Sequence, residues 1–320
     1  MSTPSELRDL VAKIEGQRKR REYFQMGSAI VAGAFFLGVI AFTLPQLAAK
    51  QQVAEAPPVE GFPVATAYDD VVISAKAAIV YDLVEGKVLY EKNAQAQLPL
   101  ASLTKLLTVY AGANALGAGS RVTVSANAIM TEGESGFMPN EEFAFSDLAK
   151  AALVGSSNDA AAAIAENAEQ RRAVSTEYLF RNAAAAAGLA STYAVNGTGL
   201  DVNGQLSGGY GSAEDIALLS GALLERVRDI ALASTKPTLT VESLSGNTYT
   251  FKNTNPDVER IPGLMLSKTG YTDLAGGNLA VIFDASINHP IAVVVLGSSV
   301  ENRFTDVDRL VQATFSTFIR

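Results

Sequence analysis

Three short motifs carry the residues with which this chain could perform covalent catalysis: Ser102-Leu-Thr-Lys105, Ser156-Ser-Asn158 and Lys268-Thr-Gly270. A serine becomes a useful nucleophile only when a nearby base takes its proton. The chain has no cysteine, which excludes a thiolate, and its one histidine, His289, lies in a stretch that predicts a turn. A catalytic zinc site built from several histidines is therefore excluded, and we predict no metal and no other cofactor. The chemistry that remains is that of a serine activated by lysine.

The Ser-x-Asn pattern occurs four times, so its surroundings must indicate which copy belongs to a site. Ser245-Gly-Asn247 and Ser286-Ile-Asn288 each lie between two strand-like runs, which predicts hairpin turns. Ser125-Ala-Asn127 follows a short strand-like run and is harder to dismiss. Ser156-Ser-Asn158 lies between two helical runs, and a loop fixed at both ends by helices holds its side chains well. We therefore favour the copy at Ser156.

Ser102 and Lys105 lie at the start of a predicted helix over residues 101–116. Residues three apart share one face of a helix, so the lysine can reach the serine hydroxyl. A lysine acts as a base only when it is neutral, which requires burial or nearby positive charge such as Lys268. Taken alone, this pair is better explained as a helix-capping serine and a solvated lysine. The presence of all three motifs favours the catalytic interpretation.

The three motifs, in this order and with their neighbours, resemble the low-molecular-weight D-alanyl-D-alanine carboxypeptidases, a branch of the penicillin-binding proteins and serine β-lactamases. The resemblance covers most of the chain after about residue 60. It implies a penicillin-binding fold with the site between two lobes, and removal of the terminal D-alanine from peptidoglycan stem peptides. It also implies that β-lactams trap the same serine. The similar stretches are Ala101–Lys105, Gly155–Ala160, Asn196–Asp201 and Lys268–Asp273.

The resemblance also assigns roles within the second motif. Ser156 would pass a proton toward the leaving amine, and Asn158 would bind the peptide group of the substrate. The competing interpretation is a helix cap, because serine, asparagine and aspartate all favour that position and Asp159 precedes an alanine run.

In the third motif, Lys268 and Thr269 would hold the free carboxylate of the substrate, since a fixed cation and a hydroxyl suit an anion. Gly270 would let the substrate lie against the strand without an intervening side chain. The resemblance places one oxyanion-binding N–H at Tyr271, beside that of Ser102. The alternative is an edge strand that enters a turn at Gly270. Several family members also use a basic residue near the last strands, for which Arg260 and Arg303 are candidates that the sequence does not separate.

Apolar periodicity predicts the fold class. Two strand-like runs around Val84-Glu-Gly86 predict an early hairpin, and residues 117 to about 228 look mostly helical, while residues 302–318 predict a closing amphipathic helix. We expect strands from both ends of the chain to join one antiparallel sheet. The result is an α+β fold, flanked by helices and with an inserted all-helical lobe. The predicted strands are Ala77–Tyr81, Lys87–Tyr90, Thr238–Val241, Thr248–Lys252, Met265–Thr269, Asn278–Asp284 and Ile291–Leu296.

The first 66 residues predict three further segments. The basic run Arg18-Lys-Arg-Arg21 precedes an uncharged stretch over residues 23–45, long enough to span a bilayer as a helix. By the positive-inside rule, residues 1–22 form a cytoplasmic tail, and this single helix anchors the rest of the chain outside the cell membrane. Residues 46–66, rich in Pro, Ala and Gln, predict an extended linker to a catalytic domain over residues 67–320. A cleaved signal peptide is the alternative, although its apolar region is usually only about 7–15 residues long.

The charge distribution limits the classes of partner that this chain is expected to bind. The formal net charge is −8, while residues 1–25 carry six basic and four acidic side chains, so the remainder is net −10. An acidic outer domain argues against nucleic acid and against peripheral binding to anionic lipid.

The motifs are compatible with three other functions. A peptidoglycan D,D-endopeptidase uses the same three motifs, so the sequence does not separate it from a carboxypeptidase. A class A β-lactamase adds a deacylating glutamate and bears Ser-Asp-Asn, whereas this chain has Ser-Ser-Asn with Glu166 and Glu169 downstream. A non-catalytic wall-binding or β-lactam-binding protein would be acylated without turning over peptide.

Overall fold

The computed structural model describes residues 67–133 and 135–318 of the 320-residue chain. The predicted tail (1–22), transmembrane anchor (23–45) and linker (46–66) lie outside the described residues. Within the described ranges, none of the helices combines the length and the apolar character that a bilayer crossing requires.

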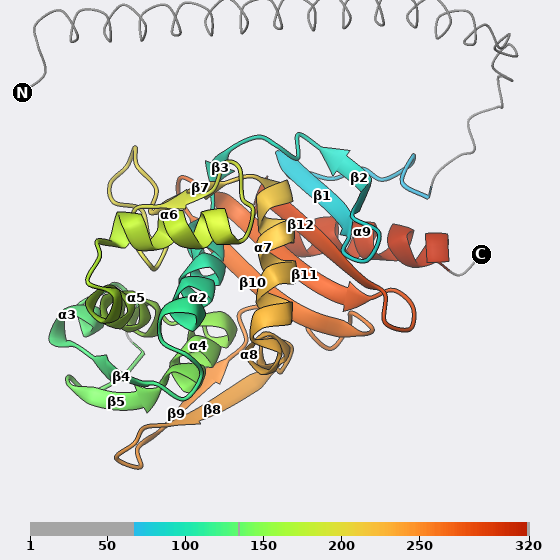
Figure 1. The fold of residues 1–320 in the computed structure, drawn as a ribbon. Helices are drawn as coiled ribbons and strands as arrows, with labels where there is room; N and C mark the ends of the chain where they lie inside the picture. The colour runs from blue at the N-terminus through green and yellow to red at the C-terminus, as the bar shows by residue number, and fades with distance from the viewer. Residues whose placement is uncertain (1–66, 134, 319–320) are drawn as a thin grey trace, which may run out of the picture. The chain divides into compact units, whose positions relative to one another are not determined.

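A five-stranded antiparallel sheet forms the centre of the domain (Figure 1). Its strand order is β10-β11-β12-β1-β2, so strands from the two ends of the domain meet where β1 pairs with β12, for example through Val80 and Val293. The expected sheet is therefore confirmed. The strands are β1 (Ala77–Asp82), β2 (Lys87–Lys92), β10 (Leu264–Thr272), β11 (Gly276–Asp284) and β12 (Pro290–Ser298).

Both faces of this sheet are covered, so its inner strands β1, β11 and β12 are buried along almost their whole length. Side chains alternate between the faces, because successive residues of a strand point in opposite directions. Ala78 and Val80 pack into the core shared with α9 (Asn302–Phe318), whereas Ile79 packs into the larger core shared with α7 (Ala213–Arg226). Figure 1 shows α7 across one face of the sheet and α9 on the other.

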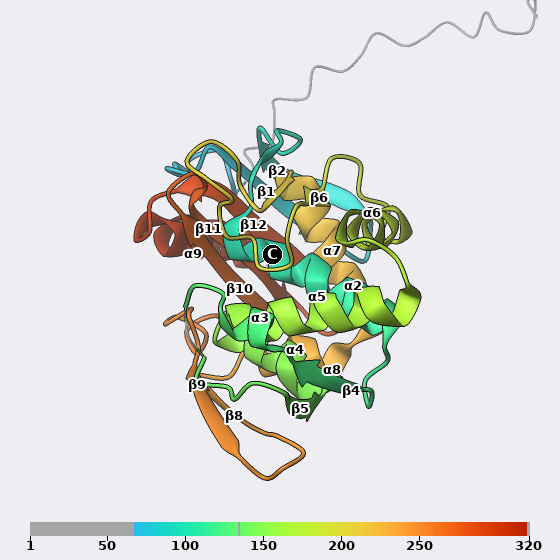
Figure 2. The same cartoon turned by 90° about the vertical axis from the view of Figure 1, so that its left-hand side faces the viewer.

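A lobe inserted between β3 (Leu98–Pro99) and β10 carries most of the remaining helices. In Figure 2, α5 crosses the front of this lobe beside α3 and α4. The lobe is mainly but not entirely helical, which corrects the expectation, because β4 and β5 pair as a short antiparallel ribbon. Its elements are α2 (Thr104–Ala115), β4 (Arg121–Val124), α3 (Ala126–Ile129), β5 (Glu141–Ala144), α4 (Phe145–Val154), α5 (Asn158–Arg172), α6 (Thr176–Ala186) and α8 (Arg228–Ala233).

Two small sheets lie beside the main one. β3 pairs with β7 (Gly209–Gly211), which also pairs with β6 (Tyr193–Ala194). β8 (Thr238–Glu242) and β9 (Thr248–Lys252) form a separate hairpin at the lower edge of the domain (Figure 1, Figure 2). These two strands were expected to join the main sheet and do not, because they pair with each other as a separate two-stranded sheet and leave β10 as an edge strand.

Candidate active site

Ser102 lies in the 3-10 turn η1 (Ala101–Leu103), immediately before α2, rather than in the first turn of an α-helix. The three-residue spacing still brings Lys105 to it, because residues three apart also align in a 3-10 turn. Lys105 Nζ donates hydrogen bonds to Ser102 Oγ at 2.8 Å and to the Thr198 carbonyl at 2.7 Å. Lys105 is fully buried, and this burial lowers its pKa to about 7. A substantial fraction of neutral lysine, able to take the serine proton, therefore exists near neutral pH.

The turn that presents Ser102 is held by the sheet. Ala101 has φ 49°, a left-handed conformation that is unfavourable for a residue with a Cβ and needs tertiary support. Asn278 of β11 supplies that support, since its Nδ2 donates to the Pro99 and Leu100 carbonyls, both at 3.0 Å. The amide oxygen of Asn278 accepts from the Gly297 N–H at 2.8 Å. The nucleophile is thus fixed to two strands of the main sheet.

The second motif forms the loop between α4 and α5. Ser156 has φ 57°, and the hydroxyl of Ser157 accepts from the Ala160 N–H at 3.0 Å, which caps α5. The cap is therefore the middle residue of the motif, so the helix-cap interpretation of Asn158 is wrong. Asn158 Nδ2 instead donates to the Glu132 carbonyl at 2.5 Å, and its buried Oδ1 has no hydrogen-bond partner among the described residues.

Lys268 joins the second and third motifs. It is buried on β10, and its Nζ donates to Ser156 Oγ at 2.9 Å and to the Thr269 carbonyl at 2.8 Å. Burial lowers the pKa of Lys268 well below its usual value, and the positive charges of Lys105 and Arg303 lower it further. The structure thus brings the three motifs together, with a buried lysine beside each of two serines; the cleft denotes this cluster of Ser102, Lys105, Ser156 and Lys268.

Thr269 and Arg303 lie at the end of the cleft beyond Lys268. Thr269 Oγ1 donates to Thr254 Oγ1 at 2.6 Å. Arg303 Nη1 donates to the Gly270 carbonyl at 2.8 Å, while its buried Nε has no hydrogen-bond partner in the described chain. Arg260, the other candidate, is exposed and pairs with Asp257 at 3.1 Å. The geometry therefore selects Arg303 as the arginine that accompanies the third motif.

Gly270 is required for a reason that the sequence did not indicate. A Cβ at this position would lie 2.9 Å from the Leu100 carbonyl oxygen and 3.3 Å from the Leu103 nitrogen. The glycine therefore allows β10 to pack directly against the turn that carries Ser102. Tyr271, the next residue, has a half-exposed side chain whose hydroxyl donates to Asp273 at 3.2 Å. The proposed role of its N–H stays a prediction.

The competing Ser-x-Asn copies and the two glutamates are engaged elsewhere. Ser245-Gly-Asn247 and Ser286-Ile-Asn288 lie in the β8–β9 and β11–β12 turns, as expected. Ser125 caps α3 by accepting from the Ala128 N–H at 3.0 Å, and its hydroxyl donates to Glu166 at 2.6 Å. Glu169 accepts from the Thr176 hydroxyl. Both glutamates therefore bind structural hydroxyls.

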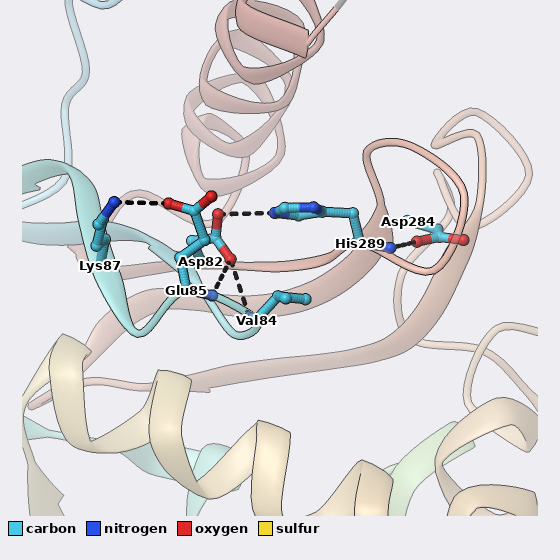
Figure 3. Close-up of polar contacts among 6 residues, drawn as sticks. All are labelled: Asp82, Val84, Glu85, Lys87, Asp284 and His289. Carbon is cyan, nitrogen blue, oxygen red and sulfur yellow. Dashed lines mark hydrogen bonds and ion pairs between the residues drawn. The ribbon is translucent and has the colours of Figure 1, made fainter.

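His289 lies in the turn that leads into β12, as expected, and serves the sheet rather than the cleft (Figure 3). Its Nε2 lies 2.7 Å from Asp82 Oδ2, and Asp82 Oδ1 accepts from the Val84 and Glu85 N–H groups, both at 2.9 Å. Burial alone would raise the pKa of Asp82, but hydrogen bonds from Glu85, His289 and Val84 lower it below its ordinary value. Within the described residues, no group of three His, Cys, Asp or Glu side chains is arranged to hold a metal.

Sequence reasoning missed three residues that shape the cleft: Thr198, Thr254 and Asn278. Thr198 acts through its main-chain carbonyl, which any residue could supply. Asn278 and Thr254 act on segments far away in the sequence. No local pattern marks such contacts, although Thr198 does fall within the Asn196–Asp201 stretch that carried part of the resemblance.

Comparisons with known proteins agree with this arrangement. A family model described as D-alanyl-D-alanine carboxypeptidase matches residues 64–300. The carboxypeptidase DacF of Bacillus subtilis is 32% identical over 254 residues, which cover 76% of this chain and 63% of that protein. The D-alanyl-D-alanine endopeptidase of Escherichia coli is 29% identical over 243 residues, covering 74% of this chain and 76% of that protein.

The fold agrees as well. The ampicillin-bound penicillin-binding protein D2 of Listeria monocytogenes superposes with a TM-score of 0.63 at 28% identity, covering 77% of this chain and 99% of that one. The chain spans less than two thirds of the length of the Bacillus relative. Because the family model matches most of this chain, the chain belongs to the D-alanyl-D-alanine carboxypeptidase family of serine peptidases.

Proposed function

We propose that this chain is a serine-type D-Ala-D-Ala carboxypeptidase that removes the terminal D-alanine from peptidoglycan stem peptides. The observation that carries the proposal is the 2.8 Å contact between Ser102 Oγ and the Nζ of Lys105, whose pKa burial lowers to about 7. A serine beside a buried amine with such a pKa is a nucleophile with its base already in place.

The first half of the reaction forms an ester. Ser102 Oγ attacks the carbonyl carbon of the penultimate D-alanine, while its proton passes to Lys105 Nζ. The N–H groups of Ser102 and Tyr271 hold the oxyanion that develops. The C–N bond then breaks, and the leaving amine takes a proton through Ser156, whose hydroxyl lies 2.9 Å from Lys268 Nζ.

The second half returns the enzyme. Water attacks the ester carbonyl as Lys105 accepts its proton. The C–O bond to Ser102 then breaks as Lys105 returns this proton to Ser102 Oγ, and the shortened peptide leaves with a new carboxylate. Asn158 holds the substrate peptide group through its unpartnered Oδ1. Thr269 and Lys268, with Arg303, receive the terminal carboxylate.

Release of D-alanine from a D-Ala–D-Ala pentapeptide tests this proposal. Wild-type chain is expected to release it, and Ser102→Ala is expected to release none while keeping the wild-type melting temperature. A mass increase of one β-lactam on wild type, absent from the variant, would identify Ser102 as the acylated residue. Release by the variant, or none by folded wild type, would contradict the proposal.

A D,D-endopeptidase activity on cross-linked peptides is the second candidate, because a relative with that name is 29% identical to this chain. Both reactions use the same acyl-enzyme and differ in the group that leaves. A cross-linked dimer peptide offered beside the pentapeptide separates them by which substrate has the higher kcat/KM. A β-lactamase is disfavoured, because Glu166 and Glu169 are held in other contacts.

We further propose that residues 23–45 anchor the enzyme in the cell membrane, with residues 1–22 in the cytoplasm and the catalytic domain outside. The support is the uncharged length of residues 23–45 and the basic run that precedes it. Protease added outside spheroplasts should cleave the catalytic domain and leave a protected N-terminal tag. A full-length chain in the soluble fraction would contradict the anchor.

A further inference from the structure

Thr254 is the residue that reaches Thr269 from outside the three motifs. Its hydroxyl accepts a hydrogen bond from Thr269 Oγ1 at 2.6 Å, a short distance for two hydroxyls. Thr269 is almost fully buried, whereas Thr254 is half-buried. The contact is therefore largely shielded from solvent, beside the residue that would meet the substrate carboxylate.

The main chain of Thr254 binds the end of α4. Its N–H donates to the Val154 carbonyl at 3.1 Å, at the end of α4 and two residues before Ser156. The preceding hairpin packs on the same point, because a Cβ on Gly155 would lie 2.6 Å from the ring of Phe251. One residue thus connects the Ser156 loop to the strand that carries Lys268 and Thr269.

Two asparagines fix the position of Thr254. Asn253 Nδ2 donates to the Ser234 carbonyl at 2.7 Å and to the Lys236 carbonyl at 2.9 Å. Asn255, fully buried, donates from Nδ2 to Ser267 Oγ at 2.9 Å, on the same strand as Thr269. A turn held on both sides in this way leaves the Thr254 hydroxyl little freedom to move away from Thr269.

In this contact between two hydroxyls, what matters is which hydroxyl donates its proton and which accepts. A hydroxyl can donate one proton and accept others, so Thr269 cannot give its proton to Thr254 and to a substrate at once. When Thr269 turns its proton to an anion, Thr254 can donate in return, and such chains of hydrogen bonds strengthen one another. A charged acceptor gains most from this, because hydrogen bonds to ionised groups are the stronger ones.

We infer that Thr254 is a positioning and specificity residue, which orients the Thr269 hydroxyl and thereby favours substrates that end in a free carboxylate. This inference rests on the proposed function of the cleft. Thr254 acts through Thr269, so removing its hydroxyl should weaken carboxylate recognition and leave the serine chemistry intact.

The test replaces Thr254 by valine, which keeps the shape and removes the hydroxyl, and compares a D-Ala–D-Ala peptide as free acid and as C-terminal amide. We expect kcat/KM for the acid to fall roughly fivefold to tenfold, as for one lost hydrogen bond between neutral groups. The loss should appear in KM, because the contact forms in ground state and transition state alike. The amide should change less than twofold, and Thr254→Ser should restore the wild-type preference.

Thr250→Val is the matched control, because Thr250 lies on β9 of the same hairpin and pairs with Thr240 at 3.0 Å on the exposed surface. It should leave the acid-to-amide ratio unchanged. An equal loss on acid and amide by Thr254→Val, or no loss on either, would overturn the inference.

The preference for a free carboxylate can also be measured without peptide turnover. Mass spectrometry would compare the rates at which benzylpenicillin and its methyl ester acylate the enzyme. If wild type cleaves no peptide but is acylated, Thr254→Val must still slow the acid selectively, so the proposed function can fail while the inference stands. A chain that neither cleaves peptide nor is acylated would overturn both.

Discussion

Two groups of buried ionisable side chains in this domain are stabilised in opposite ways. In the cleft, Lys105 and Lys268 donate to serine hydroxyls and main-chain carbonyls, all of them neutral oxygens. Around the β11–β12 turn, Asp82 meets the ring of His289 and two backbone N–H groups. Burial without a counter-charge favours the neutral form of a lysine, whereas hydrogen bonds favour the charged form of a carboxylate. The first arrangement suits proton transfer, and the second suits stability.

The largest effect is expected at Lys105, where one substitution should lower activity and raise stability. Lys105→Met should lower kcat/KM roughly 10²–10⁴-fold, the usual contribution of a general base. The free energy of unfolding at pH 7 should rise by about 1–3 kcal/mol, because an apolar side chain replaces a buried amine without a counter-charge. D-alanine release and chemical denaturation measure the two.

Lys87→Met is the control for this substitution. Lys87 is exposed and pairs with Glu85 at 2.8 Å, so both quantities should stay within error of wild type. A less stable Lys105→Met chain would show that the buried lysine contributes to folding and would remove the contrast between the two regions.

The next effect is the pH dependence of the reaction. Since the pKa of Lys105 lies at about 7, protonation below that pH removes the base, and kcat/KM should fall about tenfold per pH unit. Stability should also rise with pH. The unfolded lysine binds a proton up to its usual pKa, so the lysine favours the folded state increasingly as pH rises from about 7 toward that value.

His289→Gln sharpens this measurement, because an ordinary histidine titrates near the same pH. The acid limb of kcat/KM should persist in this variant, since the ring of His289 binds Asp82 outside the cleft. Loss of the limb would assign it to histidine and contradict the role of Lys105.

The smallest effect concerns the other region alone. Asp82→Ala should lower the free energy of unfolding by about 1–3 kcal/mol, because two N–H groups and the His289 ring lose their acceptor. Since its pKa is lowered in the folded state, the stabilisation by Asp82 exists above the unfolded pKa and is lost as pH falls through the folded one. Calorimetry measures the loss, and an accompanying fall in kcat would link the two regions.

Local signals predicted much of this molecule. The bounds of α9 and the hairpin of β1 and β2 follow from apolar periodicity and from the turn at Val84–Gly86. Ser102, Lys105 and Lys268 were found because their motifs carry the chemistry within a few residues. Long-range packing could not be predicted from local signals. It keeps β8 and β9 outside the main sheet, which the sequence did not indicate.

The same limit applies inside the cleft. Local propensity left Asn158 as a possible helix cap, whereas Ser157 takes that position. The choice of Arg303 over Arg260 depends on where α9 packs, and the need for Gly270 depends on the Leu100 carbonyl. The contacts of Arg303 and Gly270 both join segments that are distant in the sequence, so no local pattern could have predicted them.

The strand order of the main sheet has a consequence for the timing of synthesis. Ser102 leaves the ribosome well before β10, β11 and Arg303, by roughly 10–40 s at ordinary translation rates. During that interval neither Asn278 nor Gly270 exists to hold the Ser102 turn, and Lys105 stands in water as an ordinary ammonium group. The nascent chain therefore carries an unactivated serine, and nucleophilicity arises only when the last strands close the sheet.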